Sequence, residues 1–386
     1  MTDSVGYGTY YTDMHFVNDE TGYIIGKNDS RSAIFRTFDS GVTWDTVYVD
    51  SVPGTYHVTQ TLHDVYFPDP KIGYIVGHWD ILKTSDYGAT WVAVDTTDAT
   101  GVIGNQQDII FINQDTGFVG WADFGSGGLI TTDGGWTWTD APGLSSVREF
   151  NEYNGEITAC SDVWYDLDEE SLIWTAFPPP SYGADYFWKD CVKHNVKHFV
   201  IANNLYAETV DFGESWSAYS TGYGITNKIY FYNDTLGFLA GGKSGASKTI
   251  DGGTTWYSCT VDNLETTMSI NLKTIQMISP SKGFAISEKG IYVTDNGGGT
   301  GIGNQFLSIE SLPTERLMIY PNPVQNILYI DSGGNNVDKV FIYDLNGKLV
   351  IESDQNDIDI KNLSKGSYII SIQTDGQHYS SKFIKQ

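Results

Sequence analysis

An eight-residue pattern that recurs five times along the chain is the feature that most restricts its fold. It has the form Thr-x-Asp-x-Gly-x-Thr-Trp, with Ser in place of the second Thr in one copy. The copies occupy residues 37–44, 84–91, 131–138, 209–216 and 249–256. Because five copies of one pattern exceed chance, the fold has to be derived from a repeating unit.

A second repeated segment precedes the eight-residue pattern. It occupies residues 13–26, 64–77, 108–121 and 228–241, and weaker versions begin near Arg148, Asp190 and Thr274. These make seven starts, and remnants of the eight-residue pattern near 169–174 and 294–300 supply the two missing copies. The chain therefore contains seven units of about 40 residues.

Each unit has the pattern of four short strands. In the first unit we expect strands at about 13–17, 22–26, 33–37 and 43–49, where Tyr, Phe, Ile and Val alternate between turn residues. No long amphipathic helix is indicated. Four-stranded units at this period predict an all-β fold, a seven-bladed β-propeller, in which neighbouring blades bury each other's faces.

The eight-residue pattern falls between the third and fourth expected strands, where the chain must reverse. An Asp carboxylate can accept backbone N–H groups across the turn, Gly allows a positive φ, and the Trp can return to the core. We therefore predict a structural role for the turn residues Asp39, Asp86, Asp133, Asp211 and Asp251. Acidic loops can also bind cations, which is the alternative reading.

These motifs resemble the Asp-box repeat of bacterial neuraminidases, which also occurs in sortilin-type receptors, xyloglucanases and photosystem II assembly factors. The resemblance covers about residues 10–300 and implies the propeller fold. It says little about function, because the repeated residues build turns while the activities of the family lie elsewhere.

The end of the chain differs in character. Residues 301–315 are expected to be a linker, and 316–386 contain short alternating strands with Asn-Gly and Lys-Gly turns, as in a small antiparallel β-sandwich of immunoglobulin-like type. The motifs Tyr-Pro-Asn-Pro at 320–323, Tyr-Asp-x-x-Gly-Lys at 343–348 and Leu-x-x-Gly-x-Tyr at 363–368 resemble the sorting domain of the type IX secretion system of Bacteroidetes. This resemblance implies contact with the secretion machinery through 316–386, and a secreted or surface-attached protein; an accessory sandwich is the alternative.

The beginning of the chain lacks the basic start and apolar core of a signal peptide. We therefore expect that the true N-terminus lies further upstream. The seventh unit lacks an evident fourth strand, so residues 7–11 are expected to pair there and close the ring. A fourth strand from residues 306–312 would defeat this expectation.

The net charge is −26, from 22 basic and 48 acidic residues. Residues 316–386 hold 7 basic and 8 acidic residues, which leaves 15 and 40 in the rest, a net −25. This balance excludes nucleic acid as a default partner. No apolar run reaches the roughly 18 residues of a membrane helix, and a soluble monomer is expected. Of three cysteines, Cys160 and Cys191 could pair in an oxidising compartment, and no zinc spacing is present.

The first functional hypothesis is binding of an extracellular glycan or protein. The rim opposite the eight-residue turns is expected to carry exposed aromatic and acidic side chains, which suit sugar recognition. The candidate ligand-binding residues are Trp79, Asp80, Trp121, Asp123, Tyr186 and Trp188. The alternative is that several of these rings fill the channel or pack between blades.

The second hypothesis is a glycoside hydrolase that uses Asp80 and Asp123 as its carboxylate pair. With 40 acidic residues in this part of the chain, some close pair is nearly guaranteed, so the signal is weak. A sialidase is disfavoured because that family needs three converging arginines on six blades. An assembly role, as in the photosystem-associated relatives, is a third possibility. We expect no cofactor and no metal; His194 and His198 are interpreted as ordinary core or surface residues.

Overall fold

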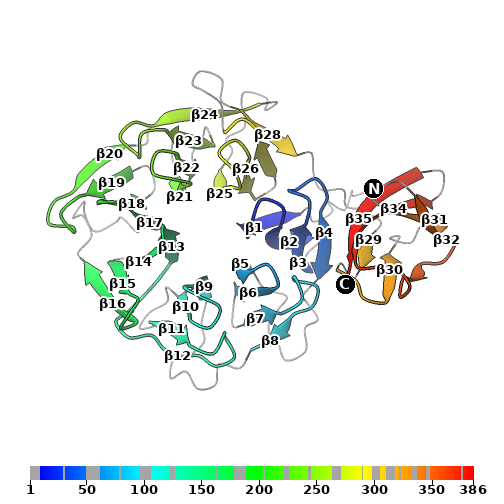
Figure 1. The fold of residues 1–386 in the computed structure, drawn as a ribbon. Coiled ribbons are helices and arrows are strands. Elements are labelled where there is room, and N and C mark those ends of the chain that lie inside the picture. Colours follow the sequence, from blue (N-terminus) through cyan, green and yellow to red (C-terminus); the bar gives the residue numbers. More distant parts are fainter. Residues whose placement is uncertain are drawn as a thin grey trace, which may run out of the picture.

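Seven four-stranded antiparallel sheets are arranged around a central channel in the computed structural model of the chain (Figure 1). The described residues are 9–28, 31–48, 61–77, 80–94, 106–121, 127–161, 163–177, 188–202, 205–220, 226–241, 245–262, 271–288, 290–297, 305–309, 318–320, 323–331, 337–344, 348–374 and 377–386. Every named element within them is a strand, and none of them forms a helix that could span a membrane. The all-β propeller predicted from the repeat is confirmed.

Each blade runs outward from the channel in chain order, with its first strand innermost (Figure 1). The strands of blades 1 to 4 are β1 (Tyr10–Phe16), β2 (Gly22–Asn28), β3 (Arg31–Thr37), β4 (Asp45–Tyr48); β5 (Leu62–Asp69), β6 (Ile72–Gly77), β7 (Ile81–Thr84), β8 (Val92–Ala93); β9 (Gln106–Phe111), β10 (Gly117–Trp121), β11 (Gly128–Thr131), β12 (Thr139–Asp140); β13 (Glu149–Tyr153), β14 (Glu156–Cys160), β15 (Trp164–Asp168) and β16 (Ile173–Phe177).

The strands of blades 5 to 7 are β17 (Asp190–His194), β18 (Lys197–Ala202), β19 (Leu205–Thr209), β20 (Ser217–Ser220); β21 (Thr226–Phe231), β22 (Gly237–Gly241), β23 (Ala246–Thr249), β24 (Tyr257–Asp262); β25 (Leu272–Met277), β26 (Gly283–Ser287), β27 (Ile291–Thr294) and β28 (Gln305–Ile309). Blades 6 and 7 share one eight-stranded sheet, because β24 pairs in parallel with β28.

The end of the ring corrects two expectations. The fourth strand of blade 7 is β28, which pairs antiparallel with β27, so the proposed closure by residues 7–11 is wrong. Tyr11 instead belongs to β1, the first strand of blade 1, although its N–H donates to the carbonyl of Glu288 over 2.9 Å. The propeller thus continues into the segment expected to be a linker. A Gly-rich stretch precedes β28 and hid this strand from the sequence pattern.

The ring closes through side chains where blade 7 meets blade 1. The amide of Gln276 bonds to both the N–H and the carbonyl of Phe16, at 2.8 and 2.9 Å. The rings of Phe16 and Phe284 stack with centroids 4.4 Å apart inside a cluster that also buries Trp44. The ring is therefore closed by side-chain packing and hydrogen bonds between blade 7 and blade 1.

The Asp-box turns have the predicted geometry. In blade 3, Asp133 accepts hydrogen bonds from the N–H groups of Trp136 and Thr137 and from two Thr hydroxyls, and Gly135 has a φ of 76°. The last Trp of the motif is buried in blades 1 to 3, where Trp138 is 0% exposed, and half-buried in blades 5 and 6. In blade 7, Asn296 takes the place of the Asp and accepts from the Thr294 hydroxyl.

Lysine side chains hydrogen-bond two of the Asp-box turns to the preceding blade. Lys83 of β7 donates to the carbonyl of Gly134 in blade 3 over 2.5 Å, and Lys248 of β23 donates to that of Gly297 in blade 7 over 2.6 Å. The Asp-box turns also contact the turns between first and second strands, so both kinds of turn share one face, which we call the Asp-box face.

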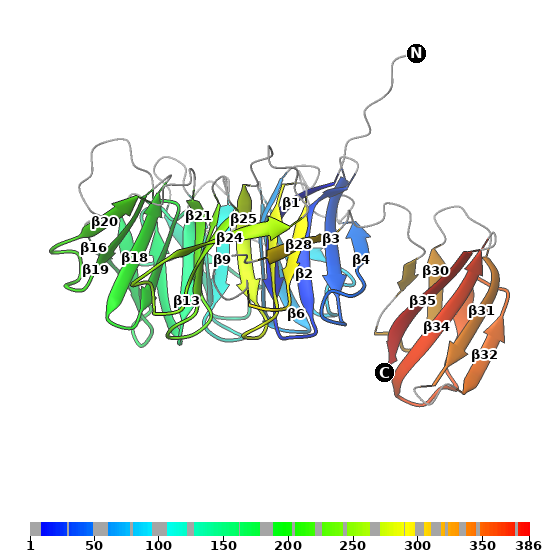
Figure 2. The same cartoon turned by 90° about the horizontal axis from the view of Figure 1, so that it is seen from above.

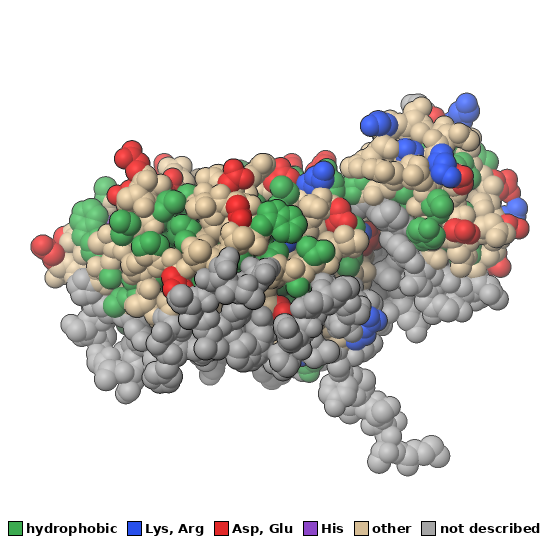
Figure 3. All heavy atoms as spheres, turned by 90° about the horizontal axis from the view of Figure 1, so that it is seen from below, with side chains coloured by type: hydrophobic (Ala, Val, Ile, Leu, Met, Phe, Trp, Pro, Cys, Tyr) green, Lys and Arg blue, Asp and Glu red, His purple; other side chains and the backbone are tan. Residues whose placement is uncertain are grey.

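The C-terminal module is a two-sheet sandwich that lies beside β4 of blade 1 (Figure 2). Its sheets contain β29 (Met318–Tyr320), β30 (Ile327–Asp331) and β33 (Asp357–Asp359), and β32 (Leu349–Ser353), β31 (Val337–Tyr343), β34 (Gly366–Thr374) and β35 (Gln377–Lys385). The inner faces bury a separate core that includes Val340, Ile370 and Phe383. In Figure 3, most of the visible Lys and Arg side chains lie on this module, in line with the uneven charge of the sequence.

Candidate functional site

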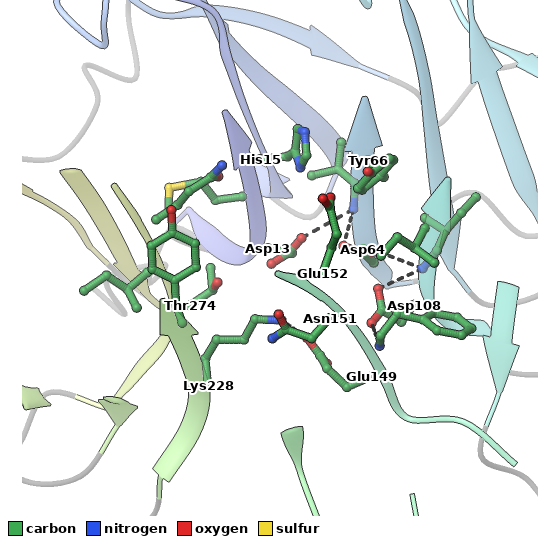
Figure 4. Close-up of a pocket in the computed structure, with 18 residues that line it drawn as sticks. Asp13, His15, Asp64, Tyr66, Asp108, Glu149, Asn151, Glu152, Lys228 and Thr274 are labelled. Carbon is green, nitrogen blue, oxygen red and sulfur yellow. Dashed lines mark hydrogen bonds and ion pairs between the residues drawn. The ribbon is translucent and has the colours of Figure 1, made fainter. Parts of the chain in front are cut away.

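One polar side chain from the innermost strand of each blade stands at the central channel or just behind it. In β1, β5, β9, β21 and β25 a β-bulge directly precedes this residue and re-aims its side chain. The seven residues are Asp13, Asp64, Asp108, Glu149, Asp190, Lys228 and Thr274. Figure 4 shows the six of them that line the cavity, all on strands that converge there.

The aspartates of this set tie each blade to the next. The Asp64 carboxylate of blade 2 accepts the N–H of Ile109 in blade 3 over 2.8 Å, and Asp190 of blade 5 accepts that of Ile229 in blade 6 over 2.7 Å. Asp13 and Asp108 do the same for Val65 and Phe150, which lie in the following blades (Figure 4). These carboxylates therefore have a structural role in addition to charging the channel.

Lys228 is the single cation among the residues that line the channel cavity. Its ammonium group pairs with Glu149 of blade 4 and lies 3.9 Å from Asp190, which is fully buried. The amide of Asn151 and the hydroxyl of Tyr153 also reach from blade 4 to blade 6, over 3.2 and 2.6 Å. Blade 5 thus lies behind these contacts, and no residue of β17 lines the cavity.

Burial governs the protonation of these groups. It raises the pKa of Asp64, where the charge of Asp108 acts in the same direction, and it raises the pKa of Asp190 to about 6. Burial also raises the pKa of Glu149 although Lys228 opposes it. For Lys228, burial alone would lower the pKa, but Asp190 and Glu149 raise it well above its usual value. Burial also raises the pKa of Asp108, where the bond from the N–H of Phe150 and the charge of Lys228 act in the opposite direction.

The channel contains a cavity of about 150 Å³, and its lining bears five carboxyl groups and one ammonium group. The carboxyl groups belong to Asp13, Asp64, Asp108, Glu149 and Glu152. Two residues further along the strands, a second layer of His15, Tyr66, Asn151, Tyr230 and Gln276 also lines the cavity. Burial lowers the pKa of His15 to about 4, so this imidazole is neutral near pH 7.

A larger recess opens at the Asp-box end of the channel. Its volume is about 550 Å³, and it lies between β13 and the turn that follows β21. The lining is aromatic and polar: Glu152, Tyr153, Asn154, Tyr230, Phe231, Tyr232, Asn233, Asp234 and Thr235. Because Glu152 and Tyr230 line both spaces, the recess and the channel cavity are adjoining parts of one site.

Glu152 stands at the junction of the two spaces and is exposed. Among the described residues its carboxylate has no hydrogen bond or ion pair, unlike that of Asp234, which accepts the Tyr153 hydroxyl over 2.6 Å. Neither lysine nor arginine lines the recess. The site therefore suits a neutral or positively charged ligand, and it disfavours carboxylated or sulfated groups.

The ligand-binding residues expected from the sequence are not brought together among the described residues. Trp121 and Trp188 are each 3% exposed and pack in core clusters between blades. Asp80 is half-buried on the opposite face, where its carbonyl accepts the N–H of Gly77. Trp79, Asp123 and Tyr186 lie outside the described residues. Of the proposed Asp80–Asp123 pair, only Asp80 is therefore described.

The channel residues coincide with the starts of the repeated segment, except that Glu149 follows the start at Arg148. The signal that could have identified them is their position: a charged or hydroxyl side chain stands at or near the start of the innermost strand in every unit. In a propeller these first strands all face one axis, so their polar residues converge. No group of three or more His, Cys, Asp or Glu side chains in the described parts of the chain is arranged to hold a metal.

Seven four-stranded blades with Asp-box turns, followed by a β-sandwich, define an Asp-box β-propeller with an accessory C-terminal domain. Residues 318–386 match the family of the secretion system C-terminal sorting domain, and residues 4–95 match the photosynthesis system II assembly factor YCF48 family. The chain is therefore an Asp-box propeller protein with a type IX sorting domain, secreted or attached to the cell surface.

Solved structures agree on the propeller. YCF48 bound to a D1 peptide is 20% identical, with a TM-score of 0.58 over 75% of this chain and 93% of that one. YCF48 from Cyanidioschyzon merolae is 16% identical, with a TM-score of 0.57 over 75% of this chain and 96% of that one. The extracellular domain of BT4673 from B. thetaiotaomicron is 13% identical, with a TM-score of 0.54 over 99% of this chain and 57% of that one. At these identities the similarity is one of fold, and no curated protein sequence matches the chain.

Proposed function

We propose that this protein is an exported binding module whose ligand occupies the recess on the Asp-box face and reaches toward the acidic channel. The observation that carries the proposal is the recess of about 550 Å³ lined by tyrosines, asparagines and carboxylates. This volume falls within the range of small-ligand sites, and the lining combines ring faces with hydrogen-bonding groups.

The electrostatics support a neutral or positively charged ligand. Five carboxyl groups and one ammonium group line the channel, and the unpaired Glu152 lies where the recess meets it. Two ligand classes satisfy these conditions: an uncharged glycan, or a protein segment with a lysine or arginine side chain. One structure of similar fold contains a bound peptide, which makes peptides a reasonable class to test beside glycans.

The test is a binding screen of the full chain against neutral glycans, acidic glycans, and peptides with lysine or glutamate at a central position. We expect hits among neutral glycans or basic peptides, and Glu152→Gln or Tyr232→Ala should weaken them about tenfold or more. The matched controls are Glu170→Gln and Tyr257→Ala, two exposed residues outside the recess. Preferential binding of acidic ligands, or hits indifferent to both recess variants, would refute the proposed site.

The hypothesis of a glycoside hydrolase depends on Asp80 and Asp123 and remains a prediction. It is tested on any glycan hit by measuring release of reducing sugar. Turnover that Asp80→Asn abolishes would replace the binding module by an enzyme, whereas binding without turnover supports the module.

A further inference from the structure

Two of the three cysteines meet where blade 4 packs against blade 5. Cys160 is the last residue of β14, and Cys191 is the second residue of β17. They are 1% and 0% exposed and share a core cluster with Trp164 and Trp188. Their thiols are in hydrogen-bonding contact. Cys259 lies elsewhere, in the cluster of blades 6 and 7.

We infer that Cys160 and Cys191 form a disulfide bond in the exported protein, which covalently joins blade 4 to blade 5. Three observations meet here: both cysteines are buried in one core cluster, their strands belong to different blades that pack against each other, and the sorting domain routes the chain through the oxidising periplasm. The disulfide needs no large movement of the backbone, because β14 and β17 already pack against each other.

The reaction is a thiol–disulfide exchange with a protein disulfide oxidant of that compartment. One cysteine thiolate attacks the oxidant's disulfide, and the second cysteine then displaces the oxidant from the mixed disulfide. The two thiols of this chain lose two protons and two electrons, and the oxidant leaves as a dithiol. Burial raises the pKa of both thiols, which makes thiolate scarce in the folded ring, so the exchange is faster while β17 is not packed onto β14.

The disulfide would strengthen a junction at which the innermost strand, β17, does not line the channel cavity. Blade 5 does not reach the channel cavity, and blade 4 is bonded directly to blade 6 in front of it. A covalent bond from β14 to β17 fixes blade 5 behind these contacts. It closes a loop of about 30 residues, which restricts the unfolded chain and raises the midpoint of thermal unfolding by about 5–10 °C.

The primary test uses the wild-type full chain exported by a host with type IX secretion. Under denaturing conditions without reductant, we expect alkylation of Cys259 alone, a mass about 2 Da below that of the reduced chain, and one peptide that links the segments of Cys160 and Cys191. With reductant, all three cysteines should be alkylated. Alkylation of all three in the unreduced exported protein would overturn the inference, as would a bond that involves Cys259.

The second measurement compares thermal midpoints with and without reductant. Reductant should lower the midpoint of the wild type and of Cys259→Ser, but not that of the double variant Cys160→Ala, Cys191→Ala. If the double variant does not fold, the alkylation pattern and peptide map of the wild type still decide the matter. An exported wild type whose midpoint is unchanged by reductant under conditions that open the bond would contradict the proposed stabilisation.

Discussion

The carboxylate of Asp64 accepts the backbone N–H of Ile109 over 2.8 Å, so a side chain of blade 2 hydrogen-bonds to the innermost strand of blade 3. Its other oxygen accepts the N–H of Val65 in its own strand over 2.8 Å. The same arrangement recurs at Asp108 and Asp190. Neighbouring blades share no backbone ladder on these strands, so these bonds stabilise the inner edge of the ring.

The first prediction concerns this link. Asp64→Ala removes both acceptors and leaves the N–H of the buried Ile109 with Asp108 as its one remaining partner, so it should cost about 2 kcal/mol of unfolding free energy. Asp64→Asn keeps a neutral acceptor and a donor for Asp108 and should cost about 1 kcal/mol. Urea unfolding followed by tryptophan fluorescence measures both, since all 11 Trp residues precede residue 316 and report the propeller alone.

Asp19→Ala is the matched control, because Asp19 is an exposed acid in a turn of blade 1. It should leave the unfolding midpoint within experimental error of the wild type. Equal losses for Asp64→Ala and Asp19→Ala would show that the link does not stabilise the ring.

The second prediction concerns the ion pair that joins blade 4 to blade 6. Lys228→Met leaves Glu149 and the buried Asp190 without their cation and should cost about 3 kcal/mol at pH 7. Glu149→Gln alone should cost less, because Lys228 retains Asp190 nearby. The double variant should be more stable than the sum of the single losses implies, by at least about 1 kcal/mol. Additive losses in this double-mutant cycle would mean that the two groups do not interact.

The sequence predicted the fold well because the determinants of the blades are local. The Asp, Gly and Trp of each turn lie within eight residues, so their spacing survives as a motif. The site was harder to predict, since Asp13 and Lys228 line one cavity only after seven blades have closed into a ring. Trp121 and Trp188 illustrate the same limit. Whether an aromatic side chain near a strand end is exposed or buried depends on how the next blade packs against it, which the local sequence does not show. Here both side chains are buried.

The third prediction tests the Asp-box turn of blade 3. The bonds from Thr137, Thr131 and Trp136 outweigh the effect of partial burial and lower the pKa of Asp133 to about 2. Asp133→Ala should lower the unfolding free energy by about 1 kcal/mol at pH 7, a small value because the carboxylate is exposed. The folded-state pKa is below the unfolded value of 3.8, so this contribution is present above pH 4 and is lost toward pH 2. A difference between wild type and variant that persists undiminished at pH 2 would contradict this account.

The fourth prediction arises from a buried pair between blades 4 and 5. The imidazole of His198 lies 4.0 Å from the carboxylate of Asp166, and its ring packs 4.1 Å from that of Trp164. Among the described residues, neither ring nitrogen of His198 has a hydrogen-bond partner. The Oδ1 atom of Asp166 also has none there. The charged groups nearest the pair are Lys193, 3.9 Å from Asp166, and Glu156, which is bonded to Lys193.

Burial shifts the two groups in opposite directions. It raises the pKa of Asp166 to about 6 against the pull of Lys193, and it lowers the pKa of His198 to about 4. Between pH 4 and 6 the folded state therefore holds a proton on Asp166 that the unfolded state releases, so this group makes stability fall as pH rises. The unfolded state protonates His198 below pH 6.5 while the folded state does not, so this group makes stability rise with pH.

These opposite contributions nearly cancel in the wild type, and single variants should separate them. Relative to the wild type, Asp166→Asn should gain stability as pH rises from 4 to 6.5, and His198→Gln should lose it, each by up to about 3 kcal/mol. The double variant should follow the pH dependence of the wild type. Urea unfolding at four pH values between 4 and 7 measures all three differences. If the unfolding free energy of both single variants changes with pH as that of the wild type does, the two groups keep their ordinary pKa values. The pair would then be hydrated despite its position between β15 and β18.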